Sequence, residues 1–229
     1  MNEEKSISVI IPVFHEQKGI NRLIDYLISL PGGRAVEIIV VDGAPEQDTI
    51  AAIIDRKVIR VASAKGRGVQ LNEGFRHAAG EYLLFLHADT FPPAEVYTYV
   101  RKTLSEKNLS AGAFTLKFDR ANALLKVLQF FSSIRVAITR IPYGDQALFI
   151  KKDVFSKIGG YKDYQLFEDV ELMERLRRKR HRIKILKQKV LTSGRRFRKS
   201  GDLRGALKII LLLILYKAGV HPDTLSKIY

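Results

Sequence analysis

The sequence predicts an α/β domain with a mostly parallel sheet and helices on both of its faces. Apolar runs of strand length alternate with segments whose apolar residues recur at helical spacing. Strands that are apolar throughout are typical of a parallel sheet covered on both faces. With 229 residues, 46% of them hydrophobic, and no low-complexity segment, the chain suits one such domain over residues 1–229.

Four strand–helix units are expected in the first half of the chain. The strands are predicted over residues 6–14, 36–41, 58–62 and 82–86, and the helices over 19–30, 47–55, 69–79 and 94–106. The alternation then breaks, with strands expected over 111–119, 146–150 and 182–191 and helices over 122–139 and 169–180. Ligands of such sheets bind at the carboxyl ends of the strands, so polar groups that follow a strand are candidate site residues.

The strand over residues 82–86 ends in the sequence His-Ala-Asp at positions 87–89. A carboxylate and an imidazole suit a divalent cation such as Mg²⁺ or Mn²⁺, and a cation there suits a pyrophosphate leaving group. A capped turn is the alternative. Asp42 ends another strand, and Glu168 and Asp169 begin a helix, where the helix dipole alone could also favour them. Together these acids favour a metal and nucleotide site.

Two common nucleotide-binding loops are absent from the sequence. The turn after the first strand, residues 12–16, reads Pro-Val-Phe-His-Glu and lacks the Gly-x-Gly-x-x-Gly of dinucleotide-binding folds. No Gly-x-x-x-x-Gly-Lys-Ser/Thr loop is present either. A nucleotide would therefore have to be bound by side chains and a metal.

The net charge of +15 points to an anionic partner. Residues 175–199 contain many basic side chains and no Asp or Glu, although a solvated helix face would explain part of this run. Anionic lipid and a phosphorylated substrate are the favoured partners, because no helix-turn-helix, RNP-like or zinc pattern supports nucleic acid.

The most hydrophobic run, residues 206–216, is shorter than the roughly 20 residues that span a bilayer. A buried helix and an interfacial helix on an anionic membrane both fit it. The acidic N-terminus differs from a signal peptide, and the absence of cysteine fits a reducing compartment. We expect a cytoplasmic location, which the interfacial alternative would refine to the inner face of the plasma membrane.

Five blocks of the sequence, taken in order, resemble the family 2 glycosyltransferases. They are residues 9–16, 39–43, 65–68, 85–89 and 167–172, and the resemblance extends from about Ile7 to Arg198. The His-Ala-Asp-Thr form of the fourth block, with residues 144–147 and 192–196, is similar to a subgroup labelled arsenosugar-biosynthesis glycosyltransferases. The family usually has Asp at the position of His87, and many relatives have a metal-binding His where this chain has Arg195 and Arg196.

The resemblance implies a Rossmann-like GT-A fold and an inverting transfer of a sugar from a nucleotide diphosphate to a small-molecule or lipid-linked hydroxyl. It implies a nucleotide-sugar-binding half over about 6–110, an acceptor half over about 111–200 and a C-terminal helical appendage over about 202–229. It assigns Asp169 as the general base and Asp89, with His87, as ligand of Mg²⁺ or Mn²⁺. The remaining roles it implies are donor binding by Pro12, Val13, Glu16, Asp42, Arg67, Gly68 and Ala88, and acceptor contacts by Asp145, Gln146 and Glu168. Arginine cannot ligate a cation but can pair with phosphate, so Arg195 and Arg196 are candidates to share the task of the metal, and a basic surface turn is the alternative.

Two other classes of function stay open. A nucleotidyltransferase would use a similar sheet with paired acids, but it needs a basic glycine-rich loop that residues 12–16 do not provide. A non-catalytic module that binds a membrane or nucleic acid on a degenerate transferase fold would account for the basic run.

Overall fold

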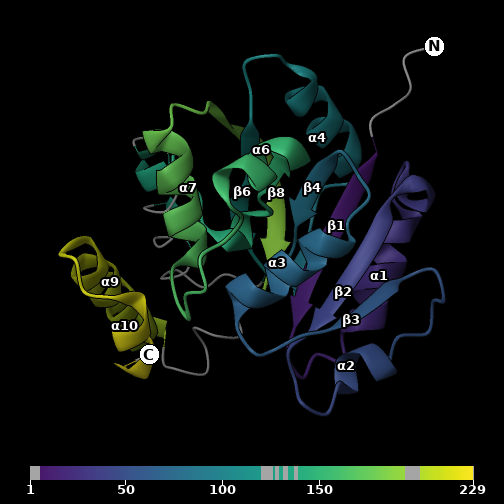
Figure 1. Cartoon of the computed structure of the whole chain (residues 1–229), viewed down its shortest axis with the longest axis horizontal. Helices are drawn as coiled ribbons and strands as arrows, with labels where there is room; N and C mark the ends of the chain where they lie inside the picture. Colours follow the sequence, from purple (N-terminus) through teal and green to yellow (C-terminus); the bar gives the residue numbers. More distant parts are fainter. Residues whose placement is uncertain are drawn as a thin grey trace.

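The computed structural model describes residues 6–119, 126, 129–130, 134–136, 139–193 and 202–228. Within them, one mixed sheet has the strand order β3-β2-β1-β4-β7-β6-β8-β5 (Figure 1). The strands are β1 (Ile7–Val13), β2 (Glu37–Asp42), β3 (Ile59–Ala62), β4 (Tyr82–Phe85), β5 (Thr90–Phe91), β6 (Ala111–Phe118), β7 (Phe149–Lys151) and β8 (Ile183–Thr192). Strands β1 to β4 pair in parallel, as do β6 and β8, whereas β7 runs antiparallel to both of its neighbours.

Helices cover both faces of the sheet, as the apolar strands predict. The described α-helices are α1 (Ile20–Ser29), α2 (Asp48–Ala51), α3 (Arg67–His77), α4 (Val96–Ser105), α6 (Lys152–Ile158), α7 (Glu168–Arg178), α9 (Asp202–Lys217) and α10 (Pro222–Ile228). Because side chains alternate along a strand, Val9 and Ile11 of β1 pack in one core with α1 and α4. Ile10 packs in a second core with α3, α6 and α7.

The structure differs from the sequence predictions mainly after residue 120. The predicted strand over 146–150 is wrong in its first half, because Gly144–Gln146 forms a short 3-10 turn (η2) and Ala147 has a left-handed backbone with φ 48°. No L-residue continues a strand in that conformation. Strand β5 and helices α6 and α10 were not predicted, and most of the helix expected over 122–139 lies outside the described residues.

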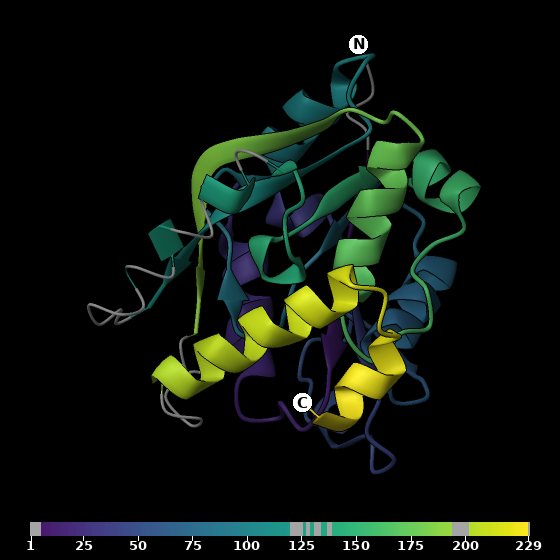
Figure 2. The ribbon, with the colours of Figure 1, turned by 90° about the vertical axis from the view of Figure 1, so that its left-hand side faces the viewer.

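The predicted C-terminal helix is α9, which lies along the outer side of the molecule beside α10 (Figure 2). None of the helices in the described part of the chain combines the length and the apolar character needed to cross a bilayer.

Candidate functional site

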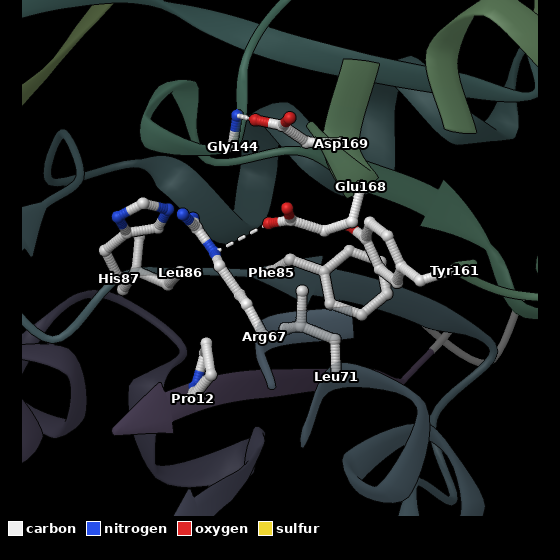
Figure 3. A pocket seen from close by; sticks show the side chains of 10 residues that line it. All are labelled: Pro12, Arg67, Leu71, Phe85, Leu86, His87, Gly144, Tyr161, Glu168 and Asp169. Atoms are coloured by element: carbon white, nitrogen blue, oxygen red, sulfur yellow. Dashed lines mark hydrogen bonds and ion pairs between the residues drawn. The ribbon is translucent and has the colours of Figure 1, made fainter. Parts of the chain in front are cut away.

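A small pocket lies at the carboxyl ends of β1 and β4 (Figure 3). Its lining comes from β1, α3, the end of β4 with the turn after it, η2, the loop between α6 and α7, and the start of α7. The lining residues are Pro12, Arg67, Leu71, Phe85, Leu86, His87, Gly144, Tyr161, Glu168 and Asp169. Phe85 and Tyr161 pack edge to face with ring centroids 5.2 Å apart and form an apolar wall. The fold thus brings a cation, an imidazole and two carboxylates to one hollow beside that wall.

Gly144 lies where three of these polar side chains converge. A Cβ atom at this position would lie 2.7 Å from Arg67 Nη2, 3.0 Å from Asp169 Oδ2 and 3.2 Å from His87 Nε2. Any other residue would therefore displace at least one of the three. The backbone N–H of Gly144 also donates a hydrogen bond to Asp169 Oδ2, so the turn η2 orients this carboxylate.

Asp169 owes its position to the way α7 begins. Phe167, immediately before the helix, has a left-handed backbone with φ 64°, a conformation that costs a non-glycine residue about 1–3 kcal/mol and is concentrated at functional sites. Asp169 Oδ1 accepts a hydrogen bond of 2.7 Å from the N–H of Val170. The half-buried carboxylate is therefore held at both oxygens and lies at the helix end that favours negative charge.

Glu168, the neighbour of Asp169, is buried and forms an ion pair with Arg67. Arg67 Nε lies 3.2 Å from Glu168 Oε1, and the side chain of Glu168 is 5% exposed. A buried carboxylate requires such a partner. The side chain of Arg67 is 32% exposed, and its Nη2 is directed toward Gly144. Because a guanidinium can pair with phosphate oxygens through two nitrogens, Arg67 is suited to bind a diphosphate.

Asp145 adds a third acid to this region. Burial, and after it the nearby charge of Asp169, raise the pKa of the Asp145 carboxyl to about 6, and Asp89 acts in the same direction. Arg67 and Arg135 oppose the shift. These effects place Asp89, Asp145 and Asp169 within electrostatic reach of one another, which suits a site that binds cations.

Arg135 and Tyr143 join this group although neither was predicted. The guanidinium carbon of Arg135 lies 3.4 Å from the ring centroid of Tyr143, and Nη1 donates to the carbonyl of Ile141 at 2.6 Å. Burial lowers the pKa of Arg135, while Tyr143, Asp145 and Asp169 raise it. Arg135 lies in a predicted amphipathic helix, where the sequence does not distinguish a buried arginine from a solvent-exposed one. No local signal could therefore have identified Arg135.

The loop between α6 and α7 is held from two sides. Asn72 on α3 donates to the carbonyl of Tyr161 at 2.9 Å and accepts from its N–H at 2.9 Å. Arg175 on α7 donates to the carbonyls of Ile158 and Gly160 and pairs with both oxygens of Glu171. These contacts fix the segment that leads to Phe167 and the two acids.

A comparison of the sequence with known families matches residues 8–164 to the family described as glycosyl transferase family 2. The chain belongs to glycosyl transferase family 2. This family 2 chain is 27% identical over 206 residues to the probable glycosyltransferase YdaM of Bacillus subtilis, which covers 77% of the chain and 47% of that protein. It is also 27% identical over 183 residues to the uncharacterized glycosyltransferase MT1564 of Mycobacterium tuberculosis, covering 76% and 70%. The chain thus spans about half the length of the Bacillus relative.

Solved structures share the fold of this family 2 chain. The mannosyltransferase PcManGT of Pyrobaculum calidifontis, in complex with GDP-Man and Mn²⁺, superposes with a TM-score of 0.66 at 20% identity over 84% of this chain and 57% of that one. Glucosyl-3-phosphoglycerate synthase of Mycobacterium tuberculosis, in complex with Mn²⁺, UDP and glucosyl-3-phosphoglycerate, superposes with a TM-score of 0.64 at 15% identity. The superposition covers 94% of this chain and 81% of that one. The predicted GT-A fold is confirmed.

The family-derived donor residues separate into two groups in the structure. Pro12 and Arg67 line the pocket. Gly68, the residue after Arg67 on α3, lies where a Cβ would collide with the carbonyl of Lys162. Val13 is buried, and Glu16 and Ala88 are half-buried at the same edge of the sheet. Their contacts with a donor stay predictions.

Asp42, the predicted base-recognition residue, is 0% exposed. Its carboxylate accepts hydrogen bonds from the N–H groups of Ala44, Thr49 and Ile50 at 2.9, 3.0 and 3.1 Å. Asp42 therefore stabilises the turn after β2 and the start of α2. Gln70, which was not predicted, bridges the neighbouring strand ends, since Nε2 donates to the carbonyls of Val13 and Val41.

Of three other predicted residues, the structure describes only Gln146. Gln146 is buried, with Oε1 accepting from the N–H of Tyr143 and Nε2 donating to the carbonyl of Phe114, each at 3.0 Å. Its acceptor-side role stays a prediction beside this structural one. Arg195 and Arg196 lie outside the described residues.

The predicted metal ligands fit a cation that is completed by its substrate. Among the residues that the structure describes, no three His, Asp or Glu side chains form a ligand cluster. Mg²⁺ sites commonly use one or two carboxylates and take their other ligands from substrate phosphates and water. Asp89 is half-buried in the turn closed by the Thr90 N–H to His87 carbonyl bond of 3.1 Å, two residues beyond the pocket-lining His87. One carboxylate and one imidazole fit such a shared site.

Proposed function

We propose that this family 2 member transfers a sugar from a nucleotide diphosphate to a hydroxyl acceptor with inversion. The observation that carries the proposal is Asp169, held at both carboxylate oxygens beside Arg67 and His87 in one pocket at the strand ends. The solved relatives support a nucleotide-sugar donor, since PcManGT is seen with GDP-Man and Staphylococcus aureus TarS with UDP-GlcNAc.

In the proposed reaction Asp169 is the general base. It accepts the proton of the acceptor hydroxyl while that oxygen attacks the anomeric carbon from the side opposite the diphosphate. The bond between the anomeric carbon and the diphosphate oxygen breaks, and the diphosphate leaves with the electron pair. Arg67 stabilises the charge on the departing phosphates through its guanidinium. A divalent cation on Asp89 and His87, when bound, supplies Lewis-acid stabilisation of the same group.

The finer assignments belong to this proposal. They comprise the donor half over about 6–110, the acceptor half over about 111–200, and acceptor contacts by Asp145 and Glu168. The acceptor is a small-molecule or lipid-linked hydroxyl, and the subgroup likeness to arsenosugar-biosynthesis enzymes is one candidate for its class. The cytoplasmic face of the membrane is the proposed location.

The first experiment identifies the donor and then tests the base. Thermal unfolding with UDP, GDP and TDP, each with and without Mn²⁺, should reveal a stabilising nucleotide, since a bound ligand raises the melting temperature. Release of that nucleoside diphosphate from its sugar conjugates then measures turnover with water as acceptor. In Asp169→Asn we expect kcat to fall by about 10²–10⁴, the usual contribution of a general base, with nucleotide affinity unchanged.

The matched control is Asp163→Asn, which removes an exposed carboxylate from the loop before α7 and should leave kcat at the wild-type value. Full turnover in Asp169→Asn would transfer the role of base to Asp145 or Glu168. Failure of every nucleoside diphosphate to stabilise the protein would contradict the donor class.

A further inference from the structure

Four large apolar side chains are exposed on one face of α9. Leu207, Ile210, Leu211 and Ile214 are 56%, 48%, 55% and 59% exposed. Their spacing of three, four and seven residues places them in one stripe along the helix. Single exposed apolar residues are ordinary, but a contiguous apolar stripe marks a surface that is covered in the functional state.

The opposite face of α9 is fixed to the body of the protein. Leu212 is 1% exposed and belongs to the core that contains α7. The ring of Tyr216 lies 5.2 Å from that of Phe167, and Lys217 forms an ion pair with Glu174 of α7. Figure 2 shows α9 along the outside of the molecule. The stripe therefore faces outward from a helix whose other side is already packed. Burying the stripe requires another molecule or a membrane surface.

The charge around the stripe indicates which kind of partner covers it. Lys208 is exposed and, at 3.6 residues per turn, projects from one flank of the stripe, whereas Lys217 is paired with Glu174. The chain has a net charge of +15. An apolar face with an exposed lysine at its flank, on a strongly basic protein, is typical of helices that lie in the interface of an anionic membrane. A second copy of this chain would instead bring another net charge of +15 to the interface, and the two copies would repel each other.

We propose that α9 docks on an anionic phospholipid surface through Leu207, Ile210, Leu211 and Ile214. The docked helix contacts Phe167, the residue directly before Glu168 and Asp169. If the proposed transfer reaction is correct, the membrane would lie beside the acceptor side of the pocket. Docking itself does not depend on that reaction.

Vesicle co-sedimentation of the full chain tests the docking. We expect wild-type protein to bind vesicles of equal parts phosphatidylglycerol and phosphatidylcholine at low salt, and to bind less at high salt or to phosphatidylcholine alone. The double variant Leu211→Gln with Ile214→Gln should bind at least ~10-fold more weakly. Burial of one large apolar side chain strengthens binding by about a factor of ten or more, and this variant loses two such side chains. Ile54→Gln is the matched control, since Ile54 is 80% exposed but far along the chain, and it should bind like wild type.

Lys208→Glu provides an independent variant that leaves the apolar stripe intact and should weaken binding at low salt. Wild-type binding by the double variant, or no binding of wild type to the anionic vesicles, would overturn the proposal. A wild-type dimer that the double variant converts to monomers, without vesicle binding, would overturn it in favour of self-association. Binding of UDP and GDP with Mn²⁺, measured without vesicles, should be equal in all variants, so a failure of the transfer reaction is detected separately.

Discussion

At the residue scale, the carboxylate of Asp42, which was predicted to bind the nucleotide base, accepts hydrogen bonds from the backbone of its own turn. Three backbone N–H groups donate to its two oxygens, and its side chain is fully buried. Asp42→Asn would place an amide nitrogen against at least one of these donors, which is unfavourable in a buried site. Weaker nucleotide binding by that variant would therefore reflect the turn as much as the base contact.

Asp145 is the residue whose titration the structure predicts most directly. Its pKa of about 6 in the folded protein lies above the usual 3.8, so the folded protein binds this proton more tightly than the unfolded chain does. The resulting loss of stability is absent below the unfolded pKa and is complete once the pH exceeds the folded pKa of about 6. Asp145→Asn avoids it.

We therefore expect ligand-free Asp145→Asn to be nearly as stable as wild type near pH 4 and more stable than wild type by roughly 3 kcal/mol near pH 7. Urea unfolding of both proteins across this pH range measures the difference. A variant that is equally or less stable at the higher pH would show that the carboxylate is well stabilised by Arg67 and Arg135.

At the scale of elements, the position of α7 depends on the loop that leads into it. Asn72 joins this loop to α3 through two hydrogen bonds to the backbone of Tyr161. Asn21 makes an equivalent pair elsewhere, donating to the carbonyl of Ala52 at 2.7 Å and accepting from the N–H of Ile54 at 3.0 Å. Each asparagine thus makes two side-chain hydrogen bonds to the backbone of a loop, but only the loop bound by Asn72 contributes to the pocket.

We expect Asn72→Ala and Asn21→Ala to lose similar stability, about 1–3 kcal/mol each, because both leave backbone groups without their partners. Only Asn72→Ala should also lower kcat for release of the nucleoside diphosphate, with little change in nucleotide affinity. Denaturant unfolding and steady-state kinetics of the two variants make the comparison. Equal kcat values would mean that the loop does not position Asp169.

At the scale of the whole molecule, the sheet topology assembles the pocket from segments far apart in sequence. Strands β1 and β4 are neighbours in parallel, and β7 then continues the sheet in the antiparallel direction. The turn η2 precedes β7, so it reaches the carboxyl end of β4 and places Gly144 against His87. A metal and nucleotide bound there would contact both halves of the chain and stabilise the fold as a unit.

We expect a saturating nucleoside diphosphate with Mn²⁺ to raise the melting temperature of wild type by about 5–10 °C, which corresponds to a ligand at about 100 times its Kd. Asp89→Ala should lose the part of this rise that requires Mn²⁺ and keep the fold. Asp25→Ala, which removes an exposed acid on α1, should retain the full rise. An unchanged Mn²⁺-dependent rise in Asp89→Ala would exclude Asp89 as a ligand.

The periodicity of the sequence was enough to predict the layered sheet and the succession of its first four strands along the chain, although not their order within the sheet. Apolar runs such as residues 7–13 and 37–42 are local signals, and they appear as β1 and β2 within a residue of the predicted bounds. The motif residues His87 and Asp169 could be placed at element ends for the same reason, because a strand or helix boundary is set by neighbouring residues.

The tertiary structure alone decided which polar residues share the pocket. Gln146 and Asp42 were predicted beside Asp169 and Arg67 on equal terms, yet the fold buries the first two in satisfied hydrogen bonds and directs the last two into the hollow. Burial and partnership depend on contacts between residues far apart in the chain, such as that of Arg67 with Glu168. Since those contacts are set by the packing of whole elements, no local pattern in the sequence determines them.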